Sequence, residues 1–235
     1  MSVDHADTTR LNRLASVARA LAREYGSPRH HNKRDSLDEL VFILLSAKTS
    51  ERSYLRTYRA LKARFPDWFA IVSAREGDVA RTIASGGLSR KKEAQIRALL
   101  ERILQAGGRR RLARLRRQDD EGVEHFLTGL PGIGLKSARC VMMYSLDRRV
   151  FPVDTHCRRI LSRLGFSEFR RLTDAIQNDM QASVPPPLRY SLHVNLVAHG
   201  RRICLSNKPK CSDCPVRRSC QYFLRNRTDS TLPPR

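Results

Sequence analysis

The chain has 235 residues, with 45 lysines and arginines against 23 acidic residues and a net charge of +22. A protein this basic usually binds a polyanion, most often nucleic acid, although a general solubility device in an arginine-rich proteome would give the same composition. The apolar run that includes Val41–Leu45 is too short to span a bilayer, and the polar residues 1–10 lack the apolar core of a secretion signal. We therefore expect a soluble cytoplasmic protein, nucleoid-associated in a prokaryote, with no membrane partner and no disulfide framework.

Apolar residues recur at helical spacing along most of the chain. The first stripe, residues 11–25, is stopped by Gly26 and Pro28. The second, residues 37–45, is apolar almost all round, so we expect this helix to be central. Further helices are expected around residues 96–104, 138–146, 160–164 and 188–196. Since no segment shows the sustained alternation of strands, the predicted fold class is all-α.

Six arginines crowd into residues 107–117 without an aromatic residue among them: Arg109, Arg110, Arg111, Arg114, Arg116 and Arg117. Such a run is typical either of a DNA-phosphate contact or of a solvated basic face. The sequence does not decide between the two.

A glycine-containing turn, residues 130–134, lies between two helical segments and reads Leu-Pro-Gly-Ile-Gly. Gly132 and Gly134 allow a tight turn and a close approach to a ligand. The amides of the turn and of the helix after it would then face outward, where a phosphate is their natural partner. This helix-hairpin-helix pattern predicts that Leu130, Gly132, Ile133 and Gly134 bind the DNA backbone without reading its sequence. A plain packing unit of two helices is the alternative.

Two residues near this turn have side chains suited to chemistry on a DNA sugar. Lys136 lies in the first turn of the second helix, and a neutral amine there can attack the sugar C1′ and form a Schiff base, or simply pair with phosphate. Asp154 follows that helix and can stabilise positive charge on the sugar and move protons. A lone aspartate in a turn is more often a helix N-cap, and Asp154 is also placed to cap a helix beginning near Thr155.

Four cysteines lie close together near the end of the chain, at Cys204, Cys211, Cys214 and Cys220, with the spacing C-x6-C-x2-C-x5-C. Four thiols in a short polar stretch indicate a metal or a cluster that holds the loop together. Zinc sites usually show two short knuckles, whereas iron–sulfur clusters accept irregular spacing, so this pattern favours a [4Fe-4S] cluster over zinc. The remaining Cys140 and Cys157 are expected to pack as small buried side chains.

These residues together resemble the endonuclease III branch of the helix-hairpin-helix (HhH-GPD) DNA glycosylases. The resemblance rests on residues 130–136 and on the segment Val-Asp-Thr-His at residues 153–156. It also rests on the four clustered cysteines and on the stretch 199–204 that leads into the first of them. It covers roughly residues 38–223.

The resemblance implies two helical halves flanking a DNA-binding cleft. A six-helix barrel with the helix-hairpin-helix motif would occupy residues 38–148. Residues 1–37 and 149–235 would form the second half, with the N-terminal helix and the [4Fe-4S] cluster domain. The partner would be double-stranded DNA with a damaged base or an abasic site, bound by a monomer.

The resemblance also implies roles for single residues. Lys136 matches the Schiff-base lysine and Asp154 the catalytic aspartate, while Cys204, Cys211, Cys214 and Cys220 match the cluster ligands. The expected DNA contacts, besides the hairpin, are Lys48, Leu88, His156, Lys208 and Lys210. Leu88 falls where the family places a side chain that wedges into the base stack, as flipping of a damaged base requires.

Some motifs depart from the bacterial enzymes. The family commonly has Leu-Leu-Ser-Ala-Gln where this chain has Lys48 in the last position, and a lysine cannot accept a hydrogen bond from the orphaned partner base. Residues 134–137, 151–155 and 207–215 look closer to the plant 5-methylcytosine DNA glycosylases. We therefore expect a bifunctional glycosylase and AP lyase that removes an oxidised or otherwise damaged pyrimidine. A modified-cytosine glycosylase and a non-catalytic DNA-binding module are the alternatives.

Overall fold

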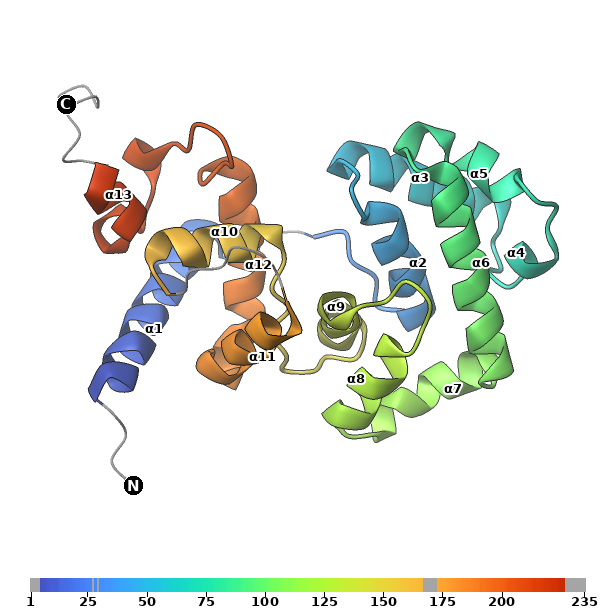
Figure 1. Cartoon of the computed structure of the whole chain (residues 1–235), viewed down its shortest axis with the longest axis horizontal. Helices are drawn as coiled ribbons and strands as arrows, with labels where there is room; N and C mark the ends of the chain where they lie inside the picture. Colours follow the sequence, from blue (N-terminus) through green and yellow to red (C-terminus); the bar gives the residue numbers. More distant parts are fainter. Residues whose placement is uncertain (1–4, 27, 29, 167–172, 227–235) are drawn as a thin grey trace. The chain divides into compact units, whose positions relative to one another are not determined.

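The computed structural model describes residues 5–26, 28, 30–166 and 173–226, and all regular structure in these ranges is helical (Figure 1). This confirms the predicted all-α class. The chain divides into two compact units, which we call the terminal unit (residues 1–30 and 149–235) and the central unit (residues 31–148). None of the described helices is long and apolar enough to cross a membrane.

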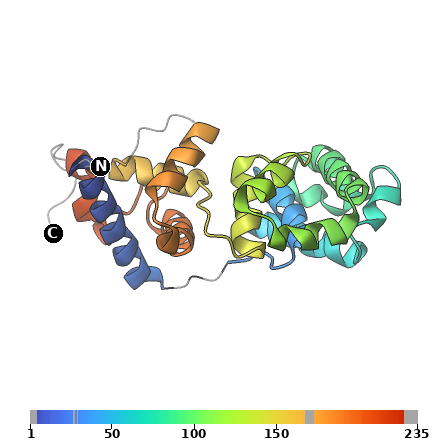
Figure 2. The same ribbon diagram turned by 90° about the horizontal axis from the view of Figure 1, so that it is seen from below.

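The central unit is built around α2. Asp35 begins this helix by accepting hydrogen bonds from the amides of Leu37 and Asp38. Residues 39–45 are all buried, and α2 packs against α3, α6, α7 and α9, so the predicted central helix is confirmed (Figure 2). The helices of this unit are α2 Ser36–Ser46, α3 Glu51–Arg64, α4 Ala70–Ser73, α5 Asp78–Thr82, α6 Ser89–Gln105, α7 Gly108–Arg114, α8 Asp120–Thr128 and α9 Leu135–Ser145, with short 3-10 turns at Ala84–Gly86 and Leu115–Arg117.

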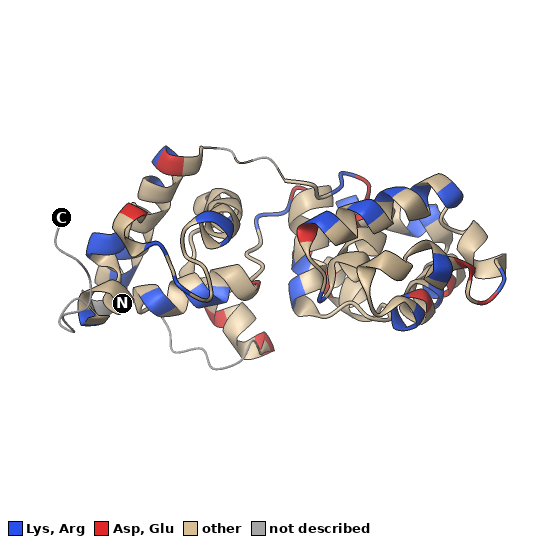
Figure 3. Ribbon diagram, turned by 90° about the horizontal axis from the view of Figure 1, so that it is seen from above, with Lys and Arg blue, Asp and Glu red and all other residues tan. Residues whose placement is uncertain are grey.

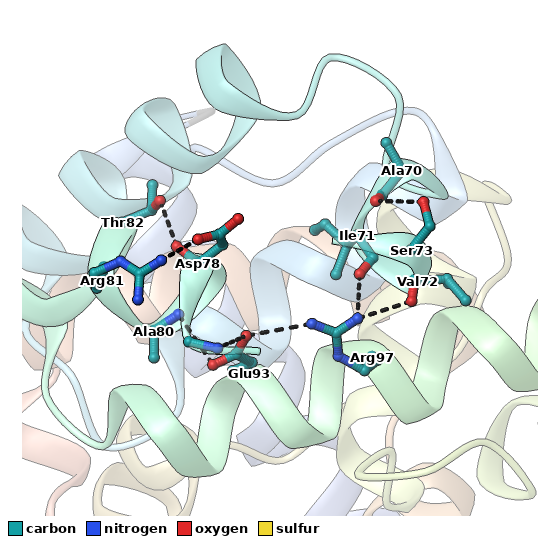
Figure 4. Close-up of polar contacts among 11 residues, drawn as sticks. Ala70, Ile71, Val72, Ser73, Asp78, Ala80, Arg81, Thr82, Glu93 and Arg97 are labelled. Carbon is teal, nitrogen blue, oxygen red and sulfur yellow. Dashed lines mark hydrogen bonds and ion pairs between the residues drawn. The ribbon is translucent and has the colours of Figure 1, made fainter. Parts of the chain in front are cut away.

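Two charged side chains of α6 fasten α4 and α5 to it (Figure 4). Glu93 is buried and accepts hydrogen bonds from the amides of Gly77 (3.0 Å) and Ala80 (3.3 Å). Arg97 donates to the carbonyl of Ile71 (2.6 Å) and lies 3.4 Å from Glu93. Because Glu93 is buried and Arg97 only partly exposed, each charge is satisfied by the partner of opposite sign.

Residues 31–37 differ from the sequence-based division, which places them with the N-terminal helix. They belong to the central unit. The carbonyl of Lys33 accepts from the hydroxyl of Ser145 (2.7 Å), and Glu39 accepts from the Asn32 side chain and the Lys33 amide, both at 2.6 Å. These hydrogen bonds explain the difference, because a sequence pattern does not show where an irregular segment is attached.

The terminal unit is organised by α12, which packs against both α1 and α10. This helix begins within the Pro185–Pro187 run, where a proline in the first turn lacks only an amide that would have no helical partner anyway. The core contains Leu14, Leu21, Phe151, Leu161, Leu192 and Leu196. The helices are α1 His5–Tyr25, α10 Thr155–Leu164, α11 Asp174–Ser183, α12 Pro186–Arg202 and α13 Gln221–Asn226, with 3-10 turns at Cys211–Asp213 and Arg217–Ser219.

The arginine run forms α7 and the turn after it. Arg111 lies over the ring of Phe126 at 4.3 Å, and Arg109 is 3.7 Å from Asp35. Arg116 donates to a carbonyl at the end of α9. These three arginines thus have intramolecular partners. Arg109 and Arg116 are nevertheless exposed, as are Arg110, Arg114 and Arg117. Lysine and arginine occur along several helices of both units rather than in this run alone (Figure 3).

Candidate active site

The hairpin between α8 and α9 is anchored by its apolar side chains and exposes its glycines. Leu130 and Ile133 are buried, and the Ile133 amide donates to the Leu130 carbonyl at 3.1 Å. Gly132 has a φ of +79°, and a Cβ there would lie 3.1 Å from a methyl group of Leu44. Leu130 and Ile133 therefore hold the turn on the core, and any contact with DNA would come from their backbone atoms.

Helix α9 begins without a side-chain cap. Gly134 occupies the N-cap position and is exposed, and nothing lies within 4 Å of a Cβ built on it. No side chain therefore caps the amides of the first turn, and there is open space beside the N-cap residue. Backbone amides at a helix N-terminus attract anions, and phosphate above all.

Lys136 lies in this first turn, half-buried, and interacts electrostatically with Glu39 on α2. Burial raises the pKa of Glu39 to about 7, and the hydrogen bonds from Asn32 and Lys33 and the charge of Lys136 oppose this rise. A buried carboxylate that titrates near neutral pH therefore lies within electrostatic range of the candidate nucleophile. The sequence pattern did not indicate Glu39, which lies on the buried face of an apolar helix.

Asp154 is the N-cap of α10 in the terminal unit. Its carboxylate accepts from the amide of Cys157 at 2.8 Å, which confirms the capping alternative. The segment before it is clamped by a buried glutamine of α11. The amide of Val153 donates to Gln177 (2.9 Å), and Gln177 donates back to the Val153 carbonyl (2.8 Å). Sequence reasoning missed Gln177, whose only signal is a glutamine on the inner face of an amphipathic helix.

His156 is half-buried against α12. Its Nδ1 atom lies 3.1 Å from Arg159, which also donates to the carbonyls of Gly200 and Cys204, each at 2.9 Å. A Cβ on Gly200 would lie 2.5 Å from this Nδ1 atom, so only glycine fits there. Burial lowers the pKa of His156, although Asp154 opposes the shift. The sequence did not point to Arg159, and it indicated Gly200 only as part of the stretch 199–204, without this role.

The four clustered cysteines line one pocket of the terminal unit, together with Arg163 and Tyr222. Burial, with smaller contributions from the neighbouring thiolates, raises the pKa of the Cys214 thiol to about 11. Arg163 donates to the sulfur of Cys204 at 3.3 Å, and His199 lies 3.5 Å from the sulfur of Cys214. Among the described residues, no three His, Cys, Asp or Glu side chains converge closely enough to hold a single metal ion.

The other two cysteines are buried, as predicted. Cys140 packs within α9, and the sulfur of Cys157 lies 3.5 Å from His193. Neither lines the pocket of the four clustered cysteines.

A family model described as HhH-GPD superfamily base excision DNA repair protein matches residues 41–186. The chain belongs to this superfamily. The matched residues run from α2 into the start of α12, so they include Lys136 and Asp154 but not the four clustered cysteines. The predicted family is confirmed.

This HhH-GPD protein is similar in sequence to two plant proteins from Arabidopsis thaliana. It is 34% identical over 189 residues to the Putative DNA glycosylase At3g47830, covering 77% of this chain and 64% of the relative. It is 32% identical over 174 residues to DNA glycosylase/AP lyase ROS1, covering 67% of this chain and 12% of the relative. The chain thus spans less than two thirds of either protein.

The fold is that of endonuclease III. The superposition on a solved structure of a trapped endonuclease III–DNA covalent intermediate has a TM-score of 0.80 and covers 92% of this chain and 98% of that chain. The sequence identity is 19%, so this likeness establishes the fold of the HhH-GPD protein alone. Its chemistry has to be argued from its own side chains.

Left-handed backbone marks three of the expected DNA contacts in this HhH-GPD protein. Four non-glycine residues of the described ranges have a positive φ, and Lys48, Leu88 and Lys208 are among them. All three are exposed, Leu88 by 54%. Residues in such conformations persist only where the surrounding structure holds them, and they are frequent at functional sites. Lys210 is also exposed and has an ordinary backbone.

Glu39 predicts a pH dependence of stability. The pKa of Glu39 is about 7 in the folded protein, against the ordinary value of 4.5 expected in the unfolded chain. Between pH 4.5 and pH 7 the folded protein therefore retains a proton that the unfolded chain has released. The free energy of unfolding should therefore fall by about 3 kcal/mol as the pH rises through this window. Glu39→Gln should remove this contribution, because an amide does not titrate and a flipped Asn32 side chain keeps both hydrogen bonds.

Urea unfolding of both proteins at about pH 5 and about pH 8 measures this difference. Trp68 is the single tryptophan of the chain and is fully buried in the central unit, so its fluorescence reports the unit that contains Glu39. A free-energy difference between the two proteins that is the same at both pH values would contradict the prediction.

Proposed function

We propose that this HhH-GPD protein is a bifunctional DNA glycosylase of base-excision repair, which removes a damaged pyrimidine and then cleaves the strand at the abasic site. The observation that carries the proposal is the place of Lys136. It is a half-buried lysine, the second residue of α9, and it follows an exposed N-cap glycine that supplies no side-chain cap. A phosphate held by the hairpin amides would keep the adjoining sugar within reach of this amine.

In the proposed reaction the Nζ atom of Lys136 forms a bond to the sugar C1′ while the bond from C1′ to the base breaks. The base leaves with the electron pair and takes up a proton. The sugar ring opens to a Schiff base, loss of a proton from C2′ expels the 3′ phosphate, and water then releases the lysine. Asp154 would stabilise the positive charge on the sugar and accept the proton that the amine loses.

The proposed partner is double-stranded DNA, bound by a monomer. Lys208, Lys210 and His156 would contact phosphates, and Leu88 would enter the base stack, as apolar wedges do in other proteins that unstack DNA. The match to a protein named DNA glycosylase/AP lyase supports cleavage as well as base removal. A non-catalytic binding module would need neither Lys136 nor Asp154.

The second candidate substrate is a modified cytosine such as 5-methylcytosine. Two observations support it as the alternative to an oxidised pyrimidine, which stays the first candidate. Residues 134–137, 151–155 and 207–215 resemble the plant 5-methylcytosine DNA glycosylases. Lys48 also stands where the bacterial enzymes have a glutamine that can accept a hydrogen bond from the partner base, so the opposite base is read differently here.

We further propose that Cys204, Cys211, Cys214 and Cys220 hold a [4Fe-4S] cluster. The donor set fits, because four thiols line one pocket without converging on a single point. A zinc ion would need all four sulfurs within about 2.3 Å of one centre, whereas each cysteine of a four-iron cluster binds a different iron. When bound, the cluster would hold residues 203–226 in shape.

Cys211→Ala tests the cluster. The purified variant should contain little iron, and hydrogen exchange in residues 203–226 should rise strongly, since this stretch has few buried apolar side chains of its own. Trp68 fluorescence should be unchanged, because the central unit has a separate core. Cys140→Ala is the matched control and should keep its iron. Full iron content and normal exchange in the Cys211 variant would contradict the proposal.

The proposed function itself is tested by borohydride trapping. The wild-type protein is mixed with duplexes that carry an abasic site, thymine glycol, 5-hydroxycytosine or 5-methylcytosine, and the Schiff base is reduced to a stable bond. A covalent band on the abasic duplex supports lyase activity, and a band on one of the other three identifies the substrate class. Binding without a band on any duplex would overturn the bifunctional assignment.

A further inference from the structure

Two exposed residues of the central unit have left-handed backbone conformations and lie in two different loops. Lys48 (φ +51°) follows α2, and Leu88 (φ +52°) is the N-cap of α6. Neither is a glycine, so this conformation is unfavourable for both. Something in the surrounding structure must hold both loops in it.

A single buried lysine contacts both loops. Lys92, on the first turn of α6, is 3% exposed. Its Nζ atom lies 2.7 Å from the carbonyl of Leu45, 2.5 Å from the hydroxyl of Thr49 and 3.5 Å from the carbonyl of Gly86. Leu45 and Thr49 flank Lys48, and Gly86 precedes Leu88 by two residues.

Thr49 closes the connection between the loops. Its hydroxyl accepts from Lys92 and lies 3.0 Å from the carbonyl of Ala47 and 3.1 Å from that of Gly86, to either of which it can donate. Gly86 is itself pressed onto α3, because a Cβ there would lie 2.8 Å from the side chain of Thr57. The loop that carries Leu88 thus has little room to move independently of the loop that carries Lys48.

All the oxygens that contact Lys92 are neutral. Burial lowers the pKa of Lys92, and no acidic residue opposes this shift. Its neighbour Glu93, by contrast, has Arg97 as a partner. A buried charge without a counter-charge is a poor source of stability, and a methionine would fill the same space without desolvation. What the ammonium adds is geometry: three donors that bind the C-terminal end of α2 and both loops at once.

We propose that Lys92 is a positioning residue that fixes the loops of Lys48 and Leu88 relative to each other, so that the two exposed side chains enter DNA as one rigid wedge. The inference rests on the proposed function in that DNA is the partner. The new element is Lys92, the buried side chain that holds the two loops of the wedge together. Figure 4 shows the adjacent anchor of α6 through Glu93 and Arg97, which keeps the helix that carries Lys92 in place.

The test is the unstacking of DNA, measured without any reaction. A duplex carries tetrahydrofuran, which cannot react with an amine, and 2-aminopurine beside it, whose fluorescence rises when the base is unstacked. Lys92→Met should lower this rise by about tenfold, as expected when hydrogen bonds from a charged donor that fix a geometry are lost. Lys91→Met removes the same charge from the exposed neighbouring position and should leave the rise within about twofold of wild type.

A second variant keeps the inference testable if Lys92→Met does not fold. Thr49→Val removes the hydroxyl that links the loops and leaves Lys92 with the carbonyls of Leu45 and Gly86, and it should also lower the fluorescence rise. Equal signals in wild type, Lys92→Met and Thr49→Val, or an equal loss in Lys91→Met, would overturn the inference, as would a wild type that produces no rise. Failure of the proposed function is distinguishable, because borohydride trapping would then fail on every duplex while the 2-aminopurine signal still responds to Lys92.

Discussion

Replacing Lys136 with alanine should abolish the borohydride-trapped complex between this protein and DNA that carries a preformed abasic site. The trapped bond is a reduced Schiff base, so it forms only on the amine that attacks C1′. Strand cleavage at the same site should fall by about a hundredfold or more, because the covalent route is closed and only slow background elimination remains. A gel that separates free from cross-linked oligonucleotide measures both outcomes.

The matched control is Lys208→Ala, which removes an exposed lysine from the terminal unit. This variant should keep the covalent band and lose about one phosphate contact, seen as a shallower dependence of log Kd on log salt. Lys136→Ala should still bind the tetrahydrofuran duplex, since the hairpin amides proposed to bind a phosphate belong to the backbone. A covalent band of normal intensity in Lys136→Ala would show that a different amine attacks the sugar.

The features that the sequence predicted well are those that depend on near neighbours. The turn at residues 130–134 follows from two glycines between apolar helices, whereas the burial of Ile133 beneath it is a finding of the structure. The cap at Asp154 needs only an acceptor three residues before a free amide. The burial of α2 follows from its own side chains, which are apolar on almost every face of the helix.

The features that the sequence did not predict depend on residues far apart in the chain. Gln177 clamps Val153 from 24 residues away, and Lys92 reaches the Leu45 carbonyl from 47 residues away. A glutamine and a lysine at such positions look like any other polar residue of an amphipathic helix, because burial is a property of the packed units. The same holds for Gly200, whose role is to leave room for His156.

Asp154→Asn should lower the rate of base excision by about 10²- to 10⁴-fold, the range expected when a carboxylate that assists proton transfer is removed. Folding should change little. Asn is as good an N-cap as Asp, so the hydrogen bond from the Cys157 amide that begins α10 can be kept. Asp154→Ala would remove both the charge and the cap, at a loss of about 1 kcal/mol of stability, and so would mix two effects.

A matched substitution elsewhere separates capping from chemistry. Asp119 caps α8 in the same way, by accepting from the Gly122 amide at 2.8 Å, and Asp119→Asn should leave both stability and excision near wild type. Single-turnover excision by the two variants and thermal unfolding of each make the comparison. If Asp154→Asn excised the base as fast as Asp119→Asn, the aspartate would be a helix cap alone, and the proton would have to leave the attacking amine by another route. A slow Asp154→Asn with an unchanged Tm would instead assign the carboxylate to the reaction, because its structural contribution is present in both proteins.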